Sequence, residues 1–217
     1  VTGIISLDLI VSIVPGLFFT IFPPYFVAGA LLSGFATVAI LAVVLRWMFA
    51  LEDLVTRQHL DYLGRMMLIF VVIVNYAYTQ EMFAAWYSGE VEYRYVYLDR
   101  WTGPYAPAWW GMILCNVGLT QLLWFRRVRR SPLAMLALGI TTNLGMWLER
   151  FQIVFTSTHA DYMPSNWDTV WPTGWDWAIY AGSLGLFGLL LLLFVRLMPM
   201  ISMHDMRAQI ADRGRDG

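Results

Sequence analysis

The sequence predicts an all-α membrane protein, a polytopic transmembrane helical bundle with five complete spans and one partial span at the N-terminus. Two observations lead to this prediction. Of the 217 residues, 59% are hydrophobic and only 13% are charged, which leaves more apolar surface than a soluble domain of this size hides. The apolar residues also gather in stretches of about 20 residues, the length that crosses a hydrocarbon core of about 30 Å as a helix.

The first apolar stretch, residues 1–16, is too short to cross a membrane. Only 14 residues precede Pro15 and Gly16, a pair that stops a helix. The stretch has no basic region and no small-residue cleavage site, so it lacks the pattern of a signal peptide. We interpret it as the end of a truncated transmembrane helix, in a chain that is the C-terminal part of a longer polypeptide. A short re-entrant or interfacial segment is the alternative.

Five later stretches are long enough to span a membrane, and together they predict a C-terminal bundle over residues 17–198. Their approximate bounds are 25–49, 62–86, 107–125, 133–155 and 175–198. Two long connections, residues 88–106 and 156–174, are rich in Trp, Tyr, Pro and acidic residues. Tryptophans in such places are typical of the interfacial belt of membrane proteins. Long aromatic loops on one face also suit the docking of a partner protein.

The basic residues predict the orientation of the bundle. All 14 of them are arginines. Arg150 lies inside a predicted span, only Arg94 and Arg100 lie in a loop at one end, and the remaining 11 lie on or near the opposite end. Positively charged loops stay in the cytoplasm. We therefore expect loops 88–106 and 156–174 to be extracytoplasmic and the polar tail, residues 199–217, to be cytoplasmic.

Ionisable residues inside the apolar stretches are the main candidates for function. Asp8, Glu81, Glu149 and Arg150 lie in segments that are otherwise apolar, and a charge at membrane depth costs a few kcal/mol. Asp8, Glu81 and Arg150 each lie about five or six residues from the extracytoplasmic boundary, a depth of roughly 8–9 Å. This common depth predicts a shared polar site that handles protons. A Glu149–Arg150 pair that only holds helices together is the alternative.

His159 and Asp161 form a second candidate in the connection 156–174. Histidine titrates near neutral pH and a nearby carboxylate tunes it, so the pair fits the release of protons outside the membrane. A hydrogen bond that only orders the loop explains the pair equally well. The single cysteine, Cys115, excludes an internal disulfide and a four-thiolate iron–sulfur cluster, and the histidine positions argue against a bis-histidine haem.

The longer motifs resemble a known family. The runs NLGMWLERF (143–151), THADYMPSNW (158–167) and WPTGWDW (171–177) are similar to the ActC-type membrane subunit of bacterial alternative complex III, in the polysulfide reductase/NrfD superfamily. The runs SLDLIVSIVPG, TIFPPYFVAGA, LEDLVT and CNVGLTQLLWF fit the same pattern. The resemblance therefore covers nearly the whole chain.

This resemblance implies a quinol:electron-acceptor oxidoreductase complex in the bacterial cytoplasmic membrane. In the family, menaquinol is oxidised near the periplasmic side. Electrons then pass to an iron–sulfur subunit and to c-type cytochrome subunits, so metals are expected only in partners. Other membrane subunits are expected as partners too, and nucleic acid is not. The chain would match the joining helix and the C-terminal bundle of such a subunit, without the N-terminal bundle that holds most of the quinol pocket.

Carried onto this sequence, the resemblance makes Asp8 the best candidate for the carboxylate that accepts a quinol proton, with His159 as a further quinol contact. We expect Asp8→Asn to lower quinol oxidation strongly and leave assembly intact. The candidates for a proton route and for the partner interface are Glu81, Glu149, Arg150, His159 and Asp161. The loop reads His-Ala-Asp-Tyr-Met where many relatives have His-Arg-Asp-Phe-Leu, which removes an arginine but keeps the histidine and the aspartate.

Two other functions stay open at this point. In a passive membrane anchor, the polar residues would only hold helices together, and another subunit would bind the quinol. A secondary transporter also places charges inside its helices, but typically near the midplane of the membrane. Here the charges lie near one surface and the sequence has no visible inverted repeat, so a transporter is the less favoured alternative.

Overall fold

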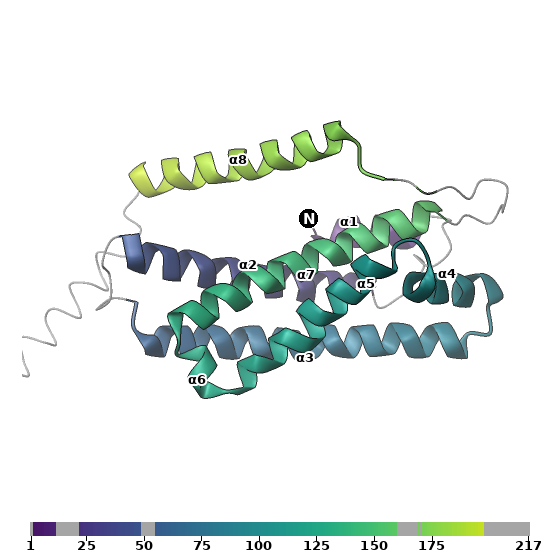
Figure 1. The fold of residues 1–217 in the computed structure, drawn as a ribbon, viewed down its shortest axis with the longest axis horizontal. Helices are drawn as coiled ribbons and strands as arrows, with labels where there is room; N and C mark the ends of the chain where they lie inside the picture. The colour runs from purple at the N-terminus through teal and green to yellow at the C-terminus, as the bar shows by residue number, and fades with distance from the viewer. Residues whose placement is uncertain (1, 12–21, 49–54, 160–168, 170, 198–217) are drawn as a thin grey trace, which may run out of the picture. The chain divides into compact units, whose positions relative to one another are not determined.

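The computed structural model describes residues 2–11, 22–48, 55–159, 169 and 171–197. Every regular element in these ranges is a helix (Figure 1), which confirms the predicted all-α class. The chain divides into two units, Val1–Val170 and Trp171–Gly217. The predicted cytoplasmic tail, residues 199–217, lies outside the described residues.

The described ranges contain ten helical elements. The second unit contains α8 (Gly174–Leu197). The first unit contains α1 (Thr2–Val11), α2 (Phe22–Met48), α3 (Arg57–Tyr87), α4 (Val91–Thr102), α5 (Ala106–Ile113), the π-helix η1 (Leu114–Gly118), the 3₁₀-helix η2 (Leu119–Trp124), α6 (Arg126–Arg129) and α7 (Pro132–His159).

Local sequence explains where several helices begin. Proline lies in the first turn of α2, α5 and α7 (Pro23, Pro107 and Pro132), where its missing N–H has no intrahelical partner to lose. Thr56 caps α3 through a capping box in which its side chain accepts from the His59 backbone and the His59 side chain accepts from the Thr56 backbone. His59 therefore has a structural role at a helix end.

The core of the first unit lies between α2, α3 and α7, which run beside one another (Figure 1). On α2 the residues Leu32, Ala36, Ala39 and Val43 have no exposed surface, and their spacing places them on one face of the helix. The opposite face of α2 is also apolar and is exposed, as at Val38. A helix that is apolar all round is typical of a membrane span or of a deeply buried core.

In the part of the chain that the structure describes, three helices are long and apolar enough to cross a membrane, with bounds Pro23–Met48, Arg57–Tyr87 and Gly174–Phe194. They correspond to the predicted spans 25–49, 62–86 and 175–198. The other two predicted spans are helical but do not qualify. Stretch 107–125 is divided among α5, η1 and η2. The polar residues Asn143, Glu149 and Arg150 lower the mean hydropathy of α7. The structure thus indicates a membrane protein, and the five-span count stays a prediction.

The predicted loop 88–106 is mostly helical, because α4 occupies Val91–Thr102. Its buried residues Tyr93, Val96, Tyr97 and Arg100 recur at the spacing of one helix face. Arg94 and Arg100 therefore lie on a helix and not in a loop.

At the second connection α7 continues to His159, so the helix includes the first residues of the predicted loop 156–174. Residues 160–168 and 170 lie outside the described part.

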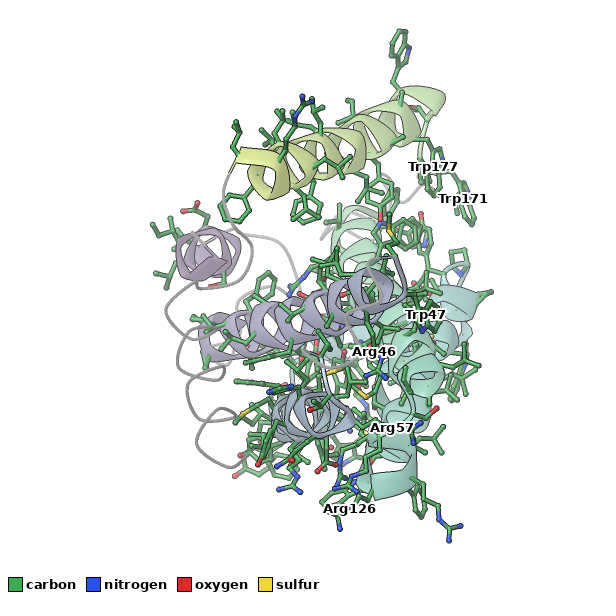
Figure 2. All side chains as sticks on the ribbon, turned by 90° about the vertical axis from the view of Figure 1, so that its left-hand side faces the viewer. Arg46, Trp47, Arg57, Arg126, Trp171 and Trp177 are labelled. Carbon is green, nitrogen blue, oxygen red and sulfur yellow. The ribbon has the colours of Figure 1, made fainter. Side chains whose placement is uncertain are left out.

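Arginines gather at one end of the first unit, as the sequence predicts. Arg46 at the end of α2, Arg57 at the start of α3 and Arg126 on α6 come from three elements at this end (Figure 2). Arg46 is buried and donates to the Val55 carbonyl. This distribution agrees with the arginine asymmetry that predicts a cytoplasmic end, and the sidedness itself stays a prediction.

In the second unit, the regular structure of the described residues is the apolar helix α8. Asp176 in its first turn accepts from the backbone N–H and the hydroxyl of Thr173, at 2.8 and 2.7 Å, which is one half of a capping box. The exposed side chains of α8 are largely apolar, with Leu186, Phe187 and Leu190 more than half exposed. Such a surface suits lipid or a protein partner in the membrane and not water.

Candidate functional site

Glu149 on α7 is the centre of a buried polar cluster. Only 1% of this residue is exposed. The hydroxyl of Tyr78 on α3 donates to Glu149 Oε2, and Tyr25 on α2 forms a second side-chain hydrogen bond with Glu149. A carboxyl group removed from water needs such partners, because burying it without hydrogen bonds is costly. Three helices of the core thus meet at one carboxyl group.

Asn116 extends this cluster to a fourth element of the chain, η1. Its Nδ2 donates to the Tyr78 hydroxyl at 2.9 Å and contacts Met146 Sδ at 3.5 Å. Asn116 is the central residue of the π-helix η1, a helix type that occurs often at functional sites. Gly145 on α7 makes room for it, since a Cβ at Gly145 would overlap the Asn116 amide. Asn116 therefore donates to Tyr78, and Tyr78 in turn donates to Glu149.

Arg150 connects this cluster to an apolar cavity between α2 and α7. Its Nη2 lies 3.5 Å from Glu149 Oε1, and its guanidinium carbon lies 3.8 Å from the centre of the Phe26 ring. The cavity has a volume of about 390 Å³. Its lining residues are Phe26, Gly29, Ala30, Ser33, Met146, Trp147 and Arg150. A charged donor therefore lies at the wall of an otherwise mostly apolar cavity.

A second buried pair joins α3 to α4. Arg100 Nη1 donates to Glu81 Oε1 at 2.6 Å, and their side chains are 4% and 12% exposed. Burial opposes the charge on Arg100, but the Glu81 carboxylate favours it, and the net result is a raised pKa for Arg100. Burial and the Glu81 charge raise the pKa of Tyr97 to about 12. Arg100 thus stays charged and Tyr97 stays neutral near pH 7.

Three of the sequence-predicted site residues come together. The charges of Glu81 and Glu149 are near enough to interact, and Arg150 contacts Glu149. Asp8 is elsewhere, since it is exposed on α1 and no hydrogen bond or ion pair joins it to another described residue. The shared depth predicted for Asp8 and the other acids is therefore not matched by a contact between them.

His159 lies at the end of α7, near a carboxylate that the sequence did not suggest. Its Nε2 is 3.9 Å from Asp99 Oδ2 on α4, and its ring meets Tyr105 edge-on at 5.5 Å between centroids. Asp161, the predicted partner, lies outside the described residues. The contact with Asp99 brings the end of α7 to α4, where the next residue, Arg100, pairs with Glu81 of α3.

Sequence reasoning missed Tyr25, Tyr78, Asp99 and Arg100 as members of these clusters. Composition does not distinguish a tyrosine of a polar cluster from other tyrosines when 16% of the residues are aromatic. A signal existed for Tyr78, which precedes Glu81 by three residues and so shares a face of α3 with it. Polar amides between membrane helices more often hold helices together than bind ligands, and the hydrogen bonds of Asn116 agree with that role.

A third charged cluster lies at the arginine-rich end and has a structural role. Asp61 on α3 is 2% exposed and contacts Arg129 Nε at 2.9 Å and Arg65 Nη2 at 2.7 Å. Arg129 also donates to the carbonyls of Leu123 and Trp124 at 2.6 and 3.0 Å. These carbonyls end η2, where helical partners are missing. The cluster therefore fastens the turn after η2 to α3.

Comparisons with known proteins identify no family for this chain. No protein-family model matches it, and no curated protein matches it. In the part of the chain that the structure describes, no group of three or more His, Cys, Asp or Glu residues is arranged to hold a metal ion. The resemblance to the ActC-type subunit therefore rests on sequence motifs alone.

Proposed function

We propose that the chain is a quinol-interacting membrane subunit of a quinol:electron-acceptor oxidoreductase complex, similar to alternative complex III of bacterial cytoplasmic membranes. The observation that carries the proposal is the buried Glu149 carboxyl group, adjacent to an arginine that lines an apolar cavity. Both residues belong to the motif NLGMWLERF (143–151), one of the runs that resemble the family.

The cavity has properties that suit a quinol. Its volume of about 390 Å³ falls in the usual range for small-molecule pockets, which are mostly apolar with a few polar groups. Arg150 Nη1 is buried and has no hydrogen-bond partner among the described residues. A buried donor of this kind needs an acceptor, and a quinol or quinone oxygen would supply one. In this arrangement Arg150 orients the ring and the apolar residues hold it out of water.

Glu149 does not itself line the cavity, but its Oε1 lies 3.5 Å from Nη2 of Arg150, which does, so Glu149 is the carboxyl group next to the site that would accept a quinol proton. Oxidation of a quinol to a quinone releases two protons and two electrons, and a base near the ring increases its rate. Tyr78 and Tyr25 hold the Glu149 carboxyl group in position. The charge of Glu81 is near enough to interact with that of Glu149. Glu81 would therefore receive the proton next and pass it toward the extracytoplasmic end. The iron–sulfur and haem groups of partner subunits would accept the electrons.

The native complex provides the test. After purification in detergent under anaerobic conditions, a menaquinol analogue should raise the α-bands of reduced haem. Glu149→Gln, which keeps size and removes the base, should slow this reduction by about a hundredfold. Glu90→Gln is the matched control, because Glu90 is exposed and its side chain makes no capping hydrogen bond. Unchanged kinetics in Glu149→Gln would exclude Glu149 as the base.

Asp8→Asn belongs in the same experiment, because the resemblance assigns proton acceptance to Asp8. A loss of activity in Asp8→Asn with normal activity in Glu149→Gln would move the base to Asp8 and keep the quinol-oxidising function. A complex that contains haem but is not reduced by quinol would indicate another electron donor. A complex without haem would remove the link to alternative complex III.

A passive anchor is the second candidate, and one observation favours it. Glu149 already has two tyrosine partners and a nearby Arg150, which is how polar groups hold membrane helices together. A photoreactive quinone analogue separates the two functions. Labelling of α2 or α7 near Arg150 is expected for a quinol site, whereas an anchor would leave this chain unlabelled and another subunit labelled.

A further inference from the structure

A second apolar groove lies between α3 and α4, on a different pair of helices from the cavity beside Arg150. Its volume is about 480 Å³. Met82, Phe83 and Trp86 of α3 line one wall, and Arg94, Leu98 and Trp101 of α4 line the other. No residue of this groove lines the cavity near Glu149. It is therefore a separate candidate for ligand binding.

The groove lies where a membrane span ends. α3 is a candidate span that ends at Tyr87. The chain then turns at Gly89, which has a φ of 72°, and α4 packs back against α3. Phe83 is 57% exposed and Trp86 is 69% exposed. Exposed tryptophans at the end of a span are typical of the level of the lipid headgroups, so the apolar groove is expected to face acyl chains.

Arg94 adds a positive charge at the wall of this groove. Its guanidinium carbon lies 4.0 Å from the centre of the Trp86 ring, and no carboxylate of a described side chain forms an ion pair with it. Arg100 on the same helix differs, since it is buried and paired with Glu81. The groove thus combines an apolar wall with a cation that has no acidic partner among the described side chains.

We propose that this groove binds one anionic phospholipid, with an acyl chain along Met82, Phe83 and Leu98 and the phosphate at Arg94. The argument is complementarity: an apolar chain attached to an anion matches an apolar groove with a cation at headgroup level. Arginine suits this role because its planar guanidinium donates two parallel hydrogen bonds to a phosphate. A neutral quinol tail would use the apolar wall but would offer Arg94 no anion.

Photolabelling tests the site in the native complex. The complex is placed in nanodiscs that contain either phosphatidylglycerol or phosphatidylcholine, each with the same diazirine-bearing acyl chain. We expect label on peptides that cover residues 79–101, with roughly fivefold more label from phosphatidylglycerol. Arg94→Gln should remove this preference. Arg127→Gln, which removes an exposed arginine of α6 outside the groove, should keep it.

A second variant tests the apolar part of the groove. Leu98→Trp, at a residue that is 48% exposed, fills space between α3 and α4 without removing charge, so label from both lipids should fall together. Three outcomes would overturn the proposal: no label on residues 79–101, equal label from the two lipids in the wild type, or an unchanged preference in Arg94→Gln. Displacement of the label by a quinone but not by phosphatidylglycerol would assign the groove to a quinol tail instead.

Discussion

Tyr78 on α3 donates a hydrogen bond to Glu149 on α7, although 71 residues separate them in the sequence. The same hydroxyl accepts a hydrogen bond from Asn116 at 2.9 Å. All three residues are buried. Since buried polar groups that lose a partner are costly, this network determines how α3, η1 and α7 fit together, whatever further role Glu149 has.

Removing the Tyr78 hydroxyl tests that network directly. Tyr78→Phe leaves Glu149 and Asn116 each without one partner, and we expect the protein to lose about 1–3 kcal/mol of stability. Thermal unfolding in detergent, followed by circular dichroism, measures the change. Tyr76→Phe is the matched control, because Tyr76 lies on the same helix and is 64% exposed. Equal unfolding temperatures of the two variants would contradict the role given to Tyr78.

The close approach of α7 to η1 depends on Gly145. In Gly145→Ala the new Cβ would lie 2.8 Å from Cys115 Cβ and would overlap the Asn116 amide, so a destabilisation of about 1–3 kcal/mol is expected from overpacking. Gly34→Ala serves for comparison, because a Cβ at that helical position meets no atom within 4 Å. Thermal unfolding should separate the two variants, and similar losses in both would argue against a specific contact at Gly145.

The Asp61 cluster allows a comparison of two arginines that contact one carboxylate. Arg129→Gln should destabilise the protein by about 3–5 kcal/mol, because a buried ion pair loses one member. Arg65→Gln should cost less than about 1 kcal/mol, since the Arg65 side chain is 51% exposed and its ion pair is screened by water and salt. Denaturation of both variants at low and high salt measures this. A larger loss in Arg65→Gln would reverse the assignment.

The pair of Glu81 and Arg100 is expected to hold α4 against α3. Arg100→Gln leaves the Glu81 carboxylate without its main partner, which should lower the free energy of local opening by about 3 kcal/mol. Amide hydrogen exchange over residues 91–102 should then be about a hundredfold faster. Glu90→Gln, at an exposed residue next to α4, should leave exchange there unchanged. Unaltered exchange in Arg100→Gln would show that apolar packing alone holds α4.

Most of the fold class was predictable from the sequence, because composition and apolar periodicity are local properties. They indicate helices and a membrane environment, and the helices α2, α3, α7 and α8 lie within a few residues of the predicted stretches. The connection 88–106 was different. Its aromatic and acidic composition suggested a loop, but Tyr93, Val96 and Tyr97 form a buried face that only packing against other helices makes visible.

The candidate site was predictable in part. The sequence by itself determined which ionisable groups lie inside apolar helices, since the charged residues and the apolar stretches around them are both read directly from the chain. Only the tertiary structure decided their partners: Tyr78 and Tyr25 for Glu149, Arg100 for Glu81, and Asp99 near His159. The physical reason is that helical periodicity sets the relative faces of residues within one helix. The face that meets a neighbour depends on how several helices pack together, through contacts between residues far apart in the chain.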